Sequence, residues 1–175
     1  MRRTRAIALA LATGTTALAA PAAARAAIDL DVGMAGFELG MTVDEVSKLG
    51  PPTTDAQDRN RNGTPRVRLY YAGPKVQVIL EQTDPDGTFT VTSVATRRGL
   101  EKTPRGVGVG TAERNLRAKI PGLTCVRAGT TRAPRRLCIT RGKKNDTAIG
   151  INATFFEISN RTKRVVRISV TRTVD

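Results

Sequence analysis

The sequence predicts an α+β protein built from two tandem repeats, each a short helical segment followed by an antiparallel β-meander. Two observations support this class. A helical pattern with a Gly-Pro stop, FELGMTVDEVSKLGPP (residues 37–52), precedes two segments of alternating apolar residues and a third segment rich in β-branched residues. A second helical pattern, VGVGTAERNLRAKIPG (residues 107–122), again precedes strand-like segments.

The first 26 residues have the pattern of a signal peptide. A basic MRRTR is followed by an alanine- and leucine-rich run and by small residues, with Ala24 and Ala26 at the spacing of a cleavage site. We therefore expect export, cleavage near Ala26 and a protein that is secreted, extracellular or in the cell envelope. The alternative is a membrane anchor, but the apolar run is short and rich in alanine, so no transmembrane segment is expected in the mature chain.

The first repeat is expected over residues 27–98, as one helix and three strands. In its helix, Thr42 and Glu45 have the spacing of a capping box, and Val43, Val46 and Leu49 form one apolar stripe. A glycine and two prolines then end the helix. Residues 27–40 are expected to be an entry segment and residues 53–65 a loop. Strands are predicted at 66–73, 74–82 and 88–98, separated by tight turns.

The second repeat is expected over residues 99–175, as one helix and about four strands. Thr111 is the predicted N-cap of its helix, whose first turn holds Glu113. A hairpin is predicted from 123–129 and 135–142, followed by strands at 147–159 and 162–174. Strand alternation predicts which side chains of these last two strands face inward. They are Ile149, Ile151, Ala153 and Phe155 in the first strand, and Val166, Ile168 and Val170 in the second.

Cys125 and Cys138 are the two cysteines of the chain. In an exported protein an even number of cysteines indicates a disulfide, and this pair would cross the predicted hairpin. Closing a loop of about 14 residues would stabilise the fold by about 3 kcal/mol. The alternative is a pair of buried free thiols. A zinc site is not expected, because the chain has two cysteines and no histidine.

The segment at residues 37–52 resembles the opening of the β-lactamase-inhibitory-protein-like repeat and of the related BamE-type envelope module. The residues that carry the resemblance are Gly40-Met41-Thr42, Val46, Leu49 and the Gly50 stop. The second copy is degenerate, with Gly110-Thr111, Leu116, Ile120 and Pro121-Gly122. The resemblance implies a curved antiparallel sheet with helices on one side and a protein-binding face on the other. It also implies a disulfide after the second helix, which Cys125 and Cys138 match.

Two departures from that family bear on function. The first repeat holds no cysteine, and the whole chain has no tryptophan, two tyrosines and four phenylalanines. The inhibitory family binds through an aromatic-rich concave face, and aromatic residues commonly dominate the energy of protein interfaces. The resemblance therefore supports the fold more strongly than it supports β-lactamase inhibition.

The formal net charge of the full chain is +14, and loss of the four arginines in residues 1–26 leaves +10. This charge indicates attraction to anionic surfaces, among them cell-wall polymers and acidic proteins. The alternative is that the charge serves solubility alone. A basic run lies between residues 132 and 144, but no aromatic residues interleave it to stack on bases, and the chain is expected to be exported. We therefore predict no nucleic-acid partner.

The composition gives little support for catalysis, and we predict that the protein is not an enzyme and holds no cofactor. Without histidine, Ser-His-acid and Cys-His arrangements cannot form. The motif DRNRNG (residues 58–63) matches the start of a calcium loop, but Leu69 occupies the position where calcium needs a bidentate carboxylate. We interpret this motif as a turn, and we predict neither catalytic residues nor a metal site.

The outward face of the predicted sheet is the best candidate for a binding site. By strand alternation it would present both basic and apolar side chains: Arg68, Tyr70, Gln77, Ile79, Asn152, Phe156 and Arg167. We predict a secreted, non-enzymatic module whose open face binds a protein. The alternative is a structural protein held to anionic wall polymer by its charge, and a third hypothesis is β-lactamase inhibition.

Overall fold

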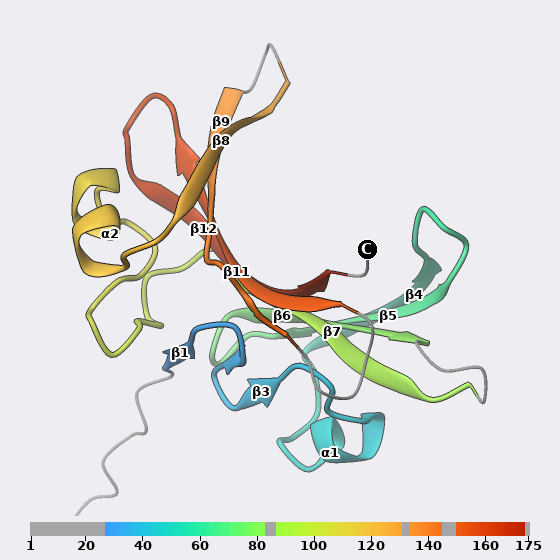
Figure 1. Cartoon of the computed structure of the whole chain (residues 1–175). Helices are drawn as coiled ribbons and strands as arrows, with labels where there is room; N and C mark the ends of the chain where they lie inside the picture. Colours follow the sequence, from blue (N-terminus) through green and yellow to red (C-terminus); the bar gives the residue numbers. More distant parts are fainter. Residues whose placement is uncertain (1–26, 83–86, 131–133, 145–149, 174–175) are drawn as a thin grey trace, which may run out of the picture.

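The fold is dominated by one large antiparallel sheet. The computed structural model describes residues 27–82, 87–130, 134–144 and 150–173. Within these ranges nine strands form the large sheet, three short strands form a second sheet, and two short helices complete the architecture (Figure 1). The predicted signal peptide at 1–26 lies outside the described residues.

The elements follow one another along the chain with short connections. The small sheet consists of β1 (Ile28–Asp29), β2 (Gly33–Met34) and β3 (Phe37–Glu38). The first half continues with α1 (Val43–Ser47), β4 (Thr54–Arg59), β5 (Pro65–Tyr71), β6 (Val76–Gln82) and β7 (Phe89–Thr96). The second half contains α2 (Glu113–Lys119), β8 (Thr124–Gly129), β9 (Pro134–Ile139), β10 (Lys143–Lys144), β11 (Ile151–Ser159) and β12 (Val165–Thr173).

Strands from both halves of the chain belong to the same sheet. Its order is β4-β5-β6-β7-β12-β11-β9-β8, and β10 pairs with β11 beside this path. The halves meet where β7 pairs with β12, with Val94 opposite Val170 and Ala95 opposite Ser169. Figure 1 shows that the sheet bends, and that α1, α2 and the small sheet lie on its convex side. The other face is concave and carries no helix within the described residues.

The predicted α+β class, with two helix-plus-meander repeats, is wrong. The described chain is mostly β, and its two helices have five and seven residues. Helices this short cannot cover a sheet, and each buries one side chain, Val46 in α1 and Leu116 in α2. The strand ladders and the small sheet supply most of the structure instead, so the strands do not divide into two helix-covered units.

The capping box of α1 is confirmed. The Glu45 backbone N–H donates to Thr42 Oγ1, and the Thr42 backbone N–H donates to Glu45 Oε2 at 2.8 Å. The predicted apolar stripe is wrong, because only Val46 is buried, whereas Val43 and Leu49 are 49% and 48% exposed. A helix of five residues meets the sheet at one point, so its other apolar side chains remain in water.

The N-cap of α2 is Ala112, one residue after the predicted Thr111. The Thr111 side chain does not cap α2. Its Oγ1 instead accepts a hydrogen bond from the Gly108 backbone N–H at 3.0 Å. Glu113 lies in the first turn, as predicted, and it pairs with Arg117 and with Arg136 of β9. The ion pair with Arg136 therefore attaches α2 to the sheet, in addition to the buried Leu116.

Residues 53–65, predicted as a loop, contain the edge strand β4. Most of its side chains are exposed, so it lacks the alternation that would identify a strand. Its backbone pairs with β5 along its whole length, from Thr54 opposite Tyr70 to Arg59 opposite Pro65. The pairing, rather than burial, defines this strand.

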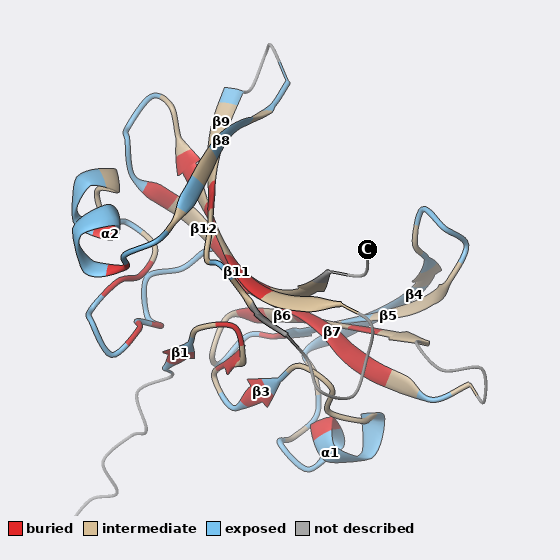
Figure 2. Cartoon of the chain, viewed as in Figure 1, coloured by how far each residue is buried: buried red, intermediate tan, exposed pale blue. Residues whose placement is uncertain are grey.

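The entry segment at 27–40 is more structured than predicted. It forms the small sheet and buries Ile28, Met34 and Phe37 against the convex side of the large sheet. Figure 2 shows buried residues concentrated in the small sheet and the middle of the large sheet, with α1 and α2 mostly exposed. One continuous apolar core therefore lies between the two sheets.

The predicted hairpin and its disulfide are confirmed. Cys125 of β8 lies directly opposite Cys138 of β9, and the two are bonded. Cys138 is fully buried in the core.

No described helix has the length and apolar character needed to cross a membrane.

Candidate binding face

The concave side of the sheet is a single surface that crosses every strand of the main path. Eight residues, one from each strand, form a row in which each lies directly opposite the next: Thr54, Tyr70, Gln77, Ala95, Ser169, Phe155, Ile139 and Thr124. Residues in one such row project to the same side of a sheet. We call this side, with the residues in alternate positions along each strand, the open face.

Two further rows extend the open face. Ala56, Arg68, Ile79, Ser93, Thr171 and Ala153 are opposed from β4 to β11. On the other half, Arg167, Glu157, Leu137 and Val126 are opposed from β12 to β8. Most residues of the three rows are buried or of intermediate exposure. Val126 and Tyr70 are more exposed, at 47% and 37%.

Five of the predicted site residues share the open face. Arg68, Tyr70, Gln77 and Ile79 lie together on β5 and β6, where Tyr70 is opposite Gln77 and Arg68 is opposite Ile79. Arg167 lies on β12, two residues before Ser169 in the first row. The structure therefore brings these five residues onto one surface.

Phe156 and Asn152 lie on the opposite face. Phe156 is fully buried, opposite Ile168 on one side and Cys138 on the other. Asn152 lies opposite Arg172, and its Oδ1 is buried without a hydrogen-bond partner. The predicted alternation of β11 is inverted, because Phe155 and Phe156 are equally apolar and their order does not show which one faces inward. Ile149, predicted as inward-facing, lies outside the described residues.

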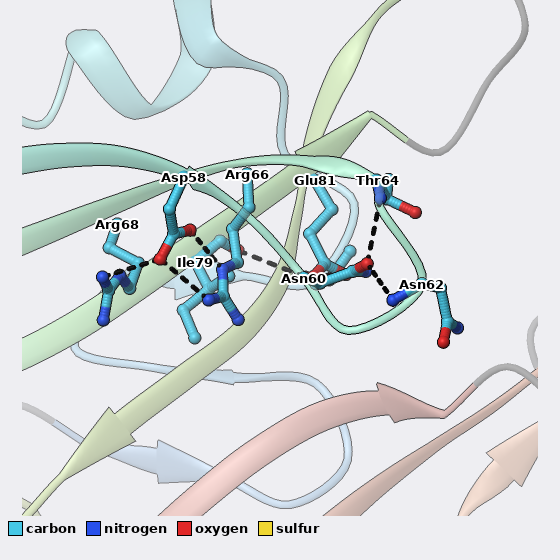
Figure 3. A network of polar contacts seen from close by, with 9 residues as sticks. Asp58, Asn60, Asn62, Thr64, Arg66, Arg68, Ile79 and Glu81 are labelled. Carbon is cyan, nitrogen blue, oxygen red and sulfur yellow. Dashed lines mark hydrogen bonds and ion pairs between the residues drawn. The ribbon is translucent and has the colours of Figure 1, made fainter.

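An arginine pair surrounds Asp58 at the β4–β5 end of the open face (Figure 3). Arg66 Nε donates to Asp58 Oδ1 at 2.7 Å, and Arg68 Nη2 lies 2.7 Å from Asp58 Oδ2. The hydrogen bond from Arg66 holds the pKa of Asp58 below its usual value. This carboxylate is therefore charged and fully engaged.

The turn beyond Asp58 is held by Asn60. Its Oδ1 accepts hydrogen bonds from the backbone N–H groups of Asn62 and Thr64, and its Nδ2 donates to Glu81 Oε1 at 3.0 Å (Figure 3). Two of the side chains that a calcium loop would present to the ion, Asp58 and Asn60, are thus used within the hairpin. In the described ranges, no group of three or more His, Cys, Asp or Glu side chains could hold a metal ion.

A second arginine pair surrounds Glu157 on the other half of the face. Arg135 Nη1 of β9 donates to Glu157 Oε2, and Arg167 Nη1 of β12 donates to Glu157 Oε1 at 3.2 Å. Glu157 lies on β11, between these two strands. Its carboxylate therefore holds two guanidinium groups side by side on the open face.

Small side chains form the centre of the open face. Ala95 and Ser169 are opposite each other, and Ser93 Oγ and Thr171 Oγ1 are hydrogen-bonded at 2.9 Å. Beside them lies a hollow of about 340 Å³ whose lining includes Tyr70, Gln77 and Arg167. The face thus combines a low centre with apolar and basic side chains around it.

Sequence reasoning missed several residues of this face. The sequence pattern predicts that Phe155 faces inward, and it does not identify Arg97, Arg98 or Arg135 as residues of the binding face. Arg97 and Arg98 directly follow β7, where the next alternate position after Ala95 is Arg97. Continuing the alternation past the strand end would have identified Arg97, whereas Arg135 required knowledge of which strand lies beside β11.

The geometry describes a class of protein: an antiparallel sheet with a covered convex side and a concave side that no described element covers. Comparison of the chain with protein-family models, curated proteins and solved structures finds no match. Function is therefore inferred from the open face itself.

Proposed function

We propose that this protein is a non-enzymatic binding module whose open face contacts a protein partner. One observation carries the proposal: a row of directly opposed residues runs across eight strands on a concave side that no described element covers. With strands about 4.8 Å apart, eight strands span about 34 Å. A face of this width, with strands about 20 Å long, approaches the ~800 Å² that one partner contributes to a standard interface.

The residue types on the open face support a protein partner. Tyr70 and Phe155 supply aromatic area at the two sides of the small central residues, and Arg68 and Arg167 are held by carboxylates. Tyrosine and arginine are enriched among residues that dominate interface energy. Arginines already held by Glu157 and Asp58 lose less conformational freedom on binding than free ones do.

Capture from the native secretome with immobilised protein tests the proposal. The variant Tyr70→Ala/Phe155→Ala removes aromatic area from the open face. The variant Val43→Ala/Leu49→Ala removes exposed apolar area from α1 and the turn that follows it, on the convex side. We expect the first variant to lose the captured protein and the second to retain it. Equal capture by both variants would contradict the assignment of the face.

The net charge of +14 favours one alternative, a structural role on anionic wall polymer. Attraction of that kind weakens with ionic strength, whereas a packed apolar interface is less sensitive to salt. Release of the protein from cell walls by salt, together with unchanged wall binding by the Tyr70→Ala/Phe155→Ala variant, would favour the polymer. For β-lactamase inhibition, a nitrocefin assay is a direct check, and we expect no inhibition because the face has few aromatic residues.

A further inference from the structure

The hollow on the open face is lined by basic groups without a carboxylate. Four cations border it, Lys75, Arg97, Arg98 and Arg167, together with Tyr70 and Gln77. Arg97 and Arg98 are exposed, and within the described ranges neither forms an ion pair. Four positive charges around about 340 Å³ repel one another, so an anion placed there would relieve that repulsion.

A neighbouring hollow continues the basic surface. It shares Arg97 and Arg167 with the first hollow and adds Arg135, and its one carboxylate is Glu157. That carboxylate is already occupied by Arg135 and Arg167. The two hollows together therefore present five cations, and the single carboxylate serves to position two of them rather than to neutralise the surface.

The shape and floor of the hollow favour a protein side chain over a flexible polyanion. Its floor includes the uncharged Ala95 and Gln77, and Tyr70 forms part of its border. A carboxylate on a short apolar stem would place its methylenes against Ala95 and Tyr70 and its oxygens toward the guanidinium groups. Planar guanidinium groups match carboxylates in a two-point geometry. A polyanion would use only the charge of the site, whereas Ala95 and Tyr70 also offer apolar contact to a side-chain stem.

We propose that this basic hollow recognises an acidic segment of the protein partner, with an Asp or Glu side chain seated between Arg97, Arg98 and Arg167. This inference rests on the proposed function and specifies its partner: a protein that presents acidic side chains beside apolar ones. The acidic side chains face the basic hollow, and the apolar ones meet the strip of Phe155, Ile139 and Leu137 on the same face.

Fluorescence anisotropy with labelled hexaglutamate, and with hexaglutamine as the neutral control, tests the inference on the intact mature protein. We expect saturable binding of hexaglutamate and none of hexaglutamine. Arg97→Gln/Arg98→Gln should bind about tenfold more weakly, the effect expected from losing charged hydrogen bonds. The control Lys48→Gln/Arg114→Gln removes the same charge from exposed positions at the end of α1 and on α2, and it should bind as the wild type does.

Three results would overturn the inference: no binding of hexaglutamate, equal weakening in both double variants, or displacement of hexaglutamate by an equimolar oligophosphate of the same charge. The last would assign the hollow to a polyphosphate polymer rather than to a protein. Secretome capture separates this inference from the proposed function. If Arg97→Gln/Arg98→Gln retains the captured protein and Tyr70→Ala/Phe155→Ala loses it, the open face binds protein without an acidic segment in the hollow.

Discussion

Arg167 of β12 and Glu157 of β11 lie directly opposite each other on the open face, with Arg167 Nη1 3.2 Å from Glu157 Oε1. Arg135 holds the other oxygen of the same carboxylate. Because both arginines remain partly exposed, the group is available to a partner while its geometry is fixed from within the sheet. It divides the open face into the basic hollow on one side and the apolar strip on the other.

The first prediction separates binding from stability at this pair. Arg167→Ala should lower the free energy of unfolding by less than about 1 kcal/mol, because partly exposed ion pairs contribute little. The same variant should lose most of the partner capture. Urea unfolding followed by circular dichroism measures the first effect. A loss of several kcal/mol would show that Arg167 is a structural residue, and any loss of capture would then say nothing about binding.

The second prediction concerns Glu101, which is fully buried with Oε1 lacking a hydrogen-bond partner. Burial raises the pKa of Glu101 above its usual value, although Thr96 donates a hydrogen bond to its Oε2 at 3.2 Å. The folded state therefore holds this proton more tightly than the unfolded state does. The stability from protonated Glu101 is present below the unfolded pKa, about 4.3, and is lost as pH rises through the raised folded pKa.

Glu101→Gln should consequently be more stable than the wild type at neutral pH, and the difference between them should shrink toward pH 4. Thermal melts at several pH values measure this difference. Stability curves that stay parallel from pH 4 to pH 7 would contradict the prediction.

The third prediction concerns the contact between the small sheet and the large one. Asp31 follows β1 with a φ of 64°, and its Oδ1 accepts hydrogen bonds from Thr140 Oγ1 and Thr154 Oγ1. The Asp31 backbone N–H donates to Thr154 Oγ1 at 2.8 Å. Asp31→Ala should cost about 2 kcal/mol, because it leaves the buried Thr154 hydroxyl without its acceptor.

Asp29→Ala is the matched control for that variant, since Asp29 is an exposed carboxylate two residues earlier. It should change stability by less than about 0.5 kcal/mol. Asp31→Asn keeps both an acceptor oxygen and a side chain that tolerates positive φ, so it should recover part of the loss. Equal effects of the two alanine variants in urea unfolding would rule out the contact as a stabilising one.

The fourth prediction concerns the disulfide, which joins cysteines 13 residues apart in sequence. Reduction or the double change Cys125→Ala/Cys138→Ala should lower the unfolding free energy by about 3 kcal/mol, the entropy gained by the unfolded chain. Urea unfolding with and without a reductant provides the measurement. The double variant should show no response to the reductant, and a wild type that is equally unresponsive would refute the stabilising role.

Local signals in the sequence were sufficient for several parts of this structure. The Thr42 and Glu45 cap depends on residues three apart, and the apolar residues of β5 and β6 alternate with polar ones. The hairpin that joins Cys125 and Cys138 is also local. Each of these features is determined by neighbours in the chain, so no knowledge of the remaining fold was needed.

The parts that were missed depend on distant neighbours. The polar strand β4 exists because β5 lies beside it, and the contact of Asp31 with Thr154 joins residues 123 positions apart. Phe155 and Phe156 could not be assigned to faces from their order alone. The helices were overestimated because the apolar pattern of Val43, Val46 and Leu49 shows what could be buried, not how much of a five-residue helix reaches the sheet.

Site-specific photo-crosslinking in the native secretome tests the central claim most directly. A benzoylphenylalanine at position 70 places the reactive group on the open face at the least perturbing position, since Tyr70 is already aromatic and exposed. The same group at position 49 places it just after α1, on the convex side. We expect covalent adducts to a secreted protein from position 70 and none from position 49. Adducts from position 49 alone, or equally from both positions, would contradict a binding site on the open face.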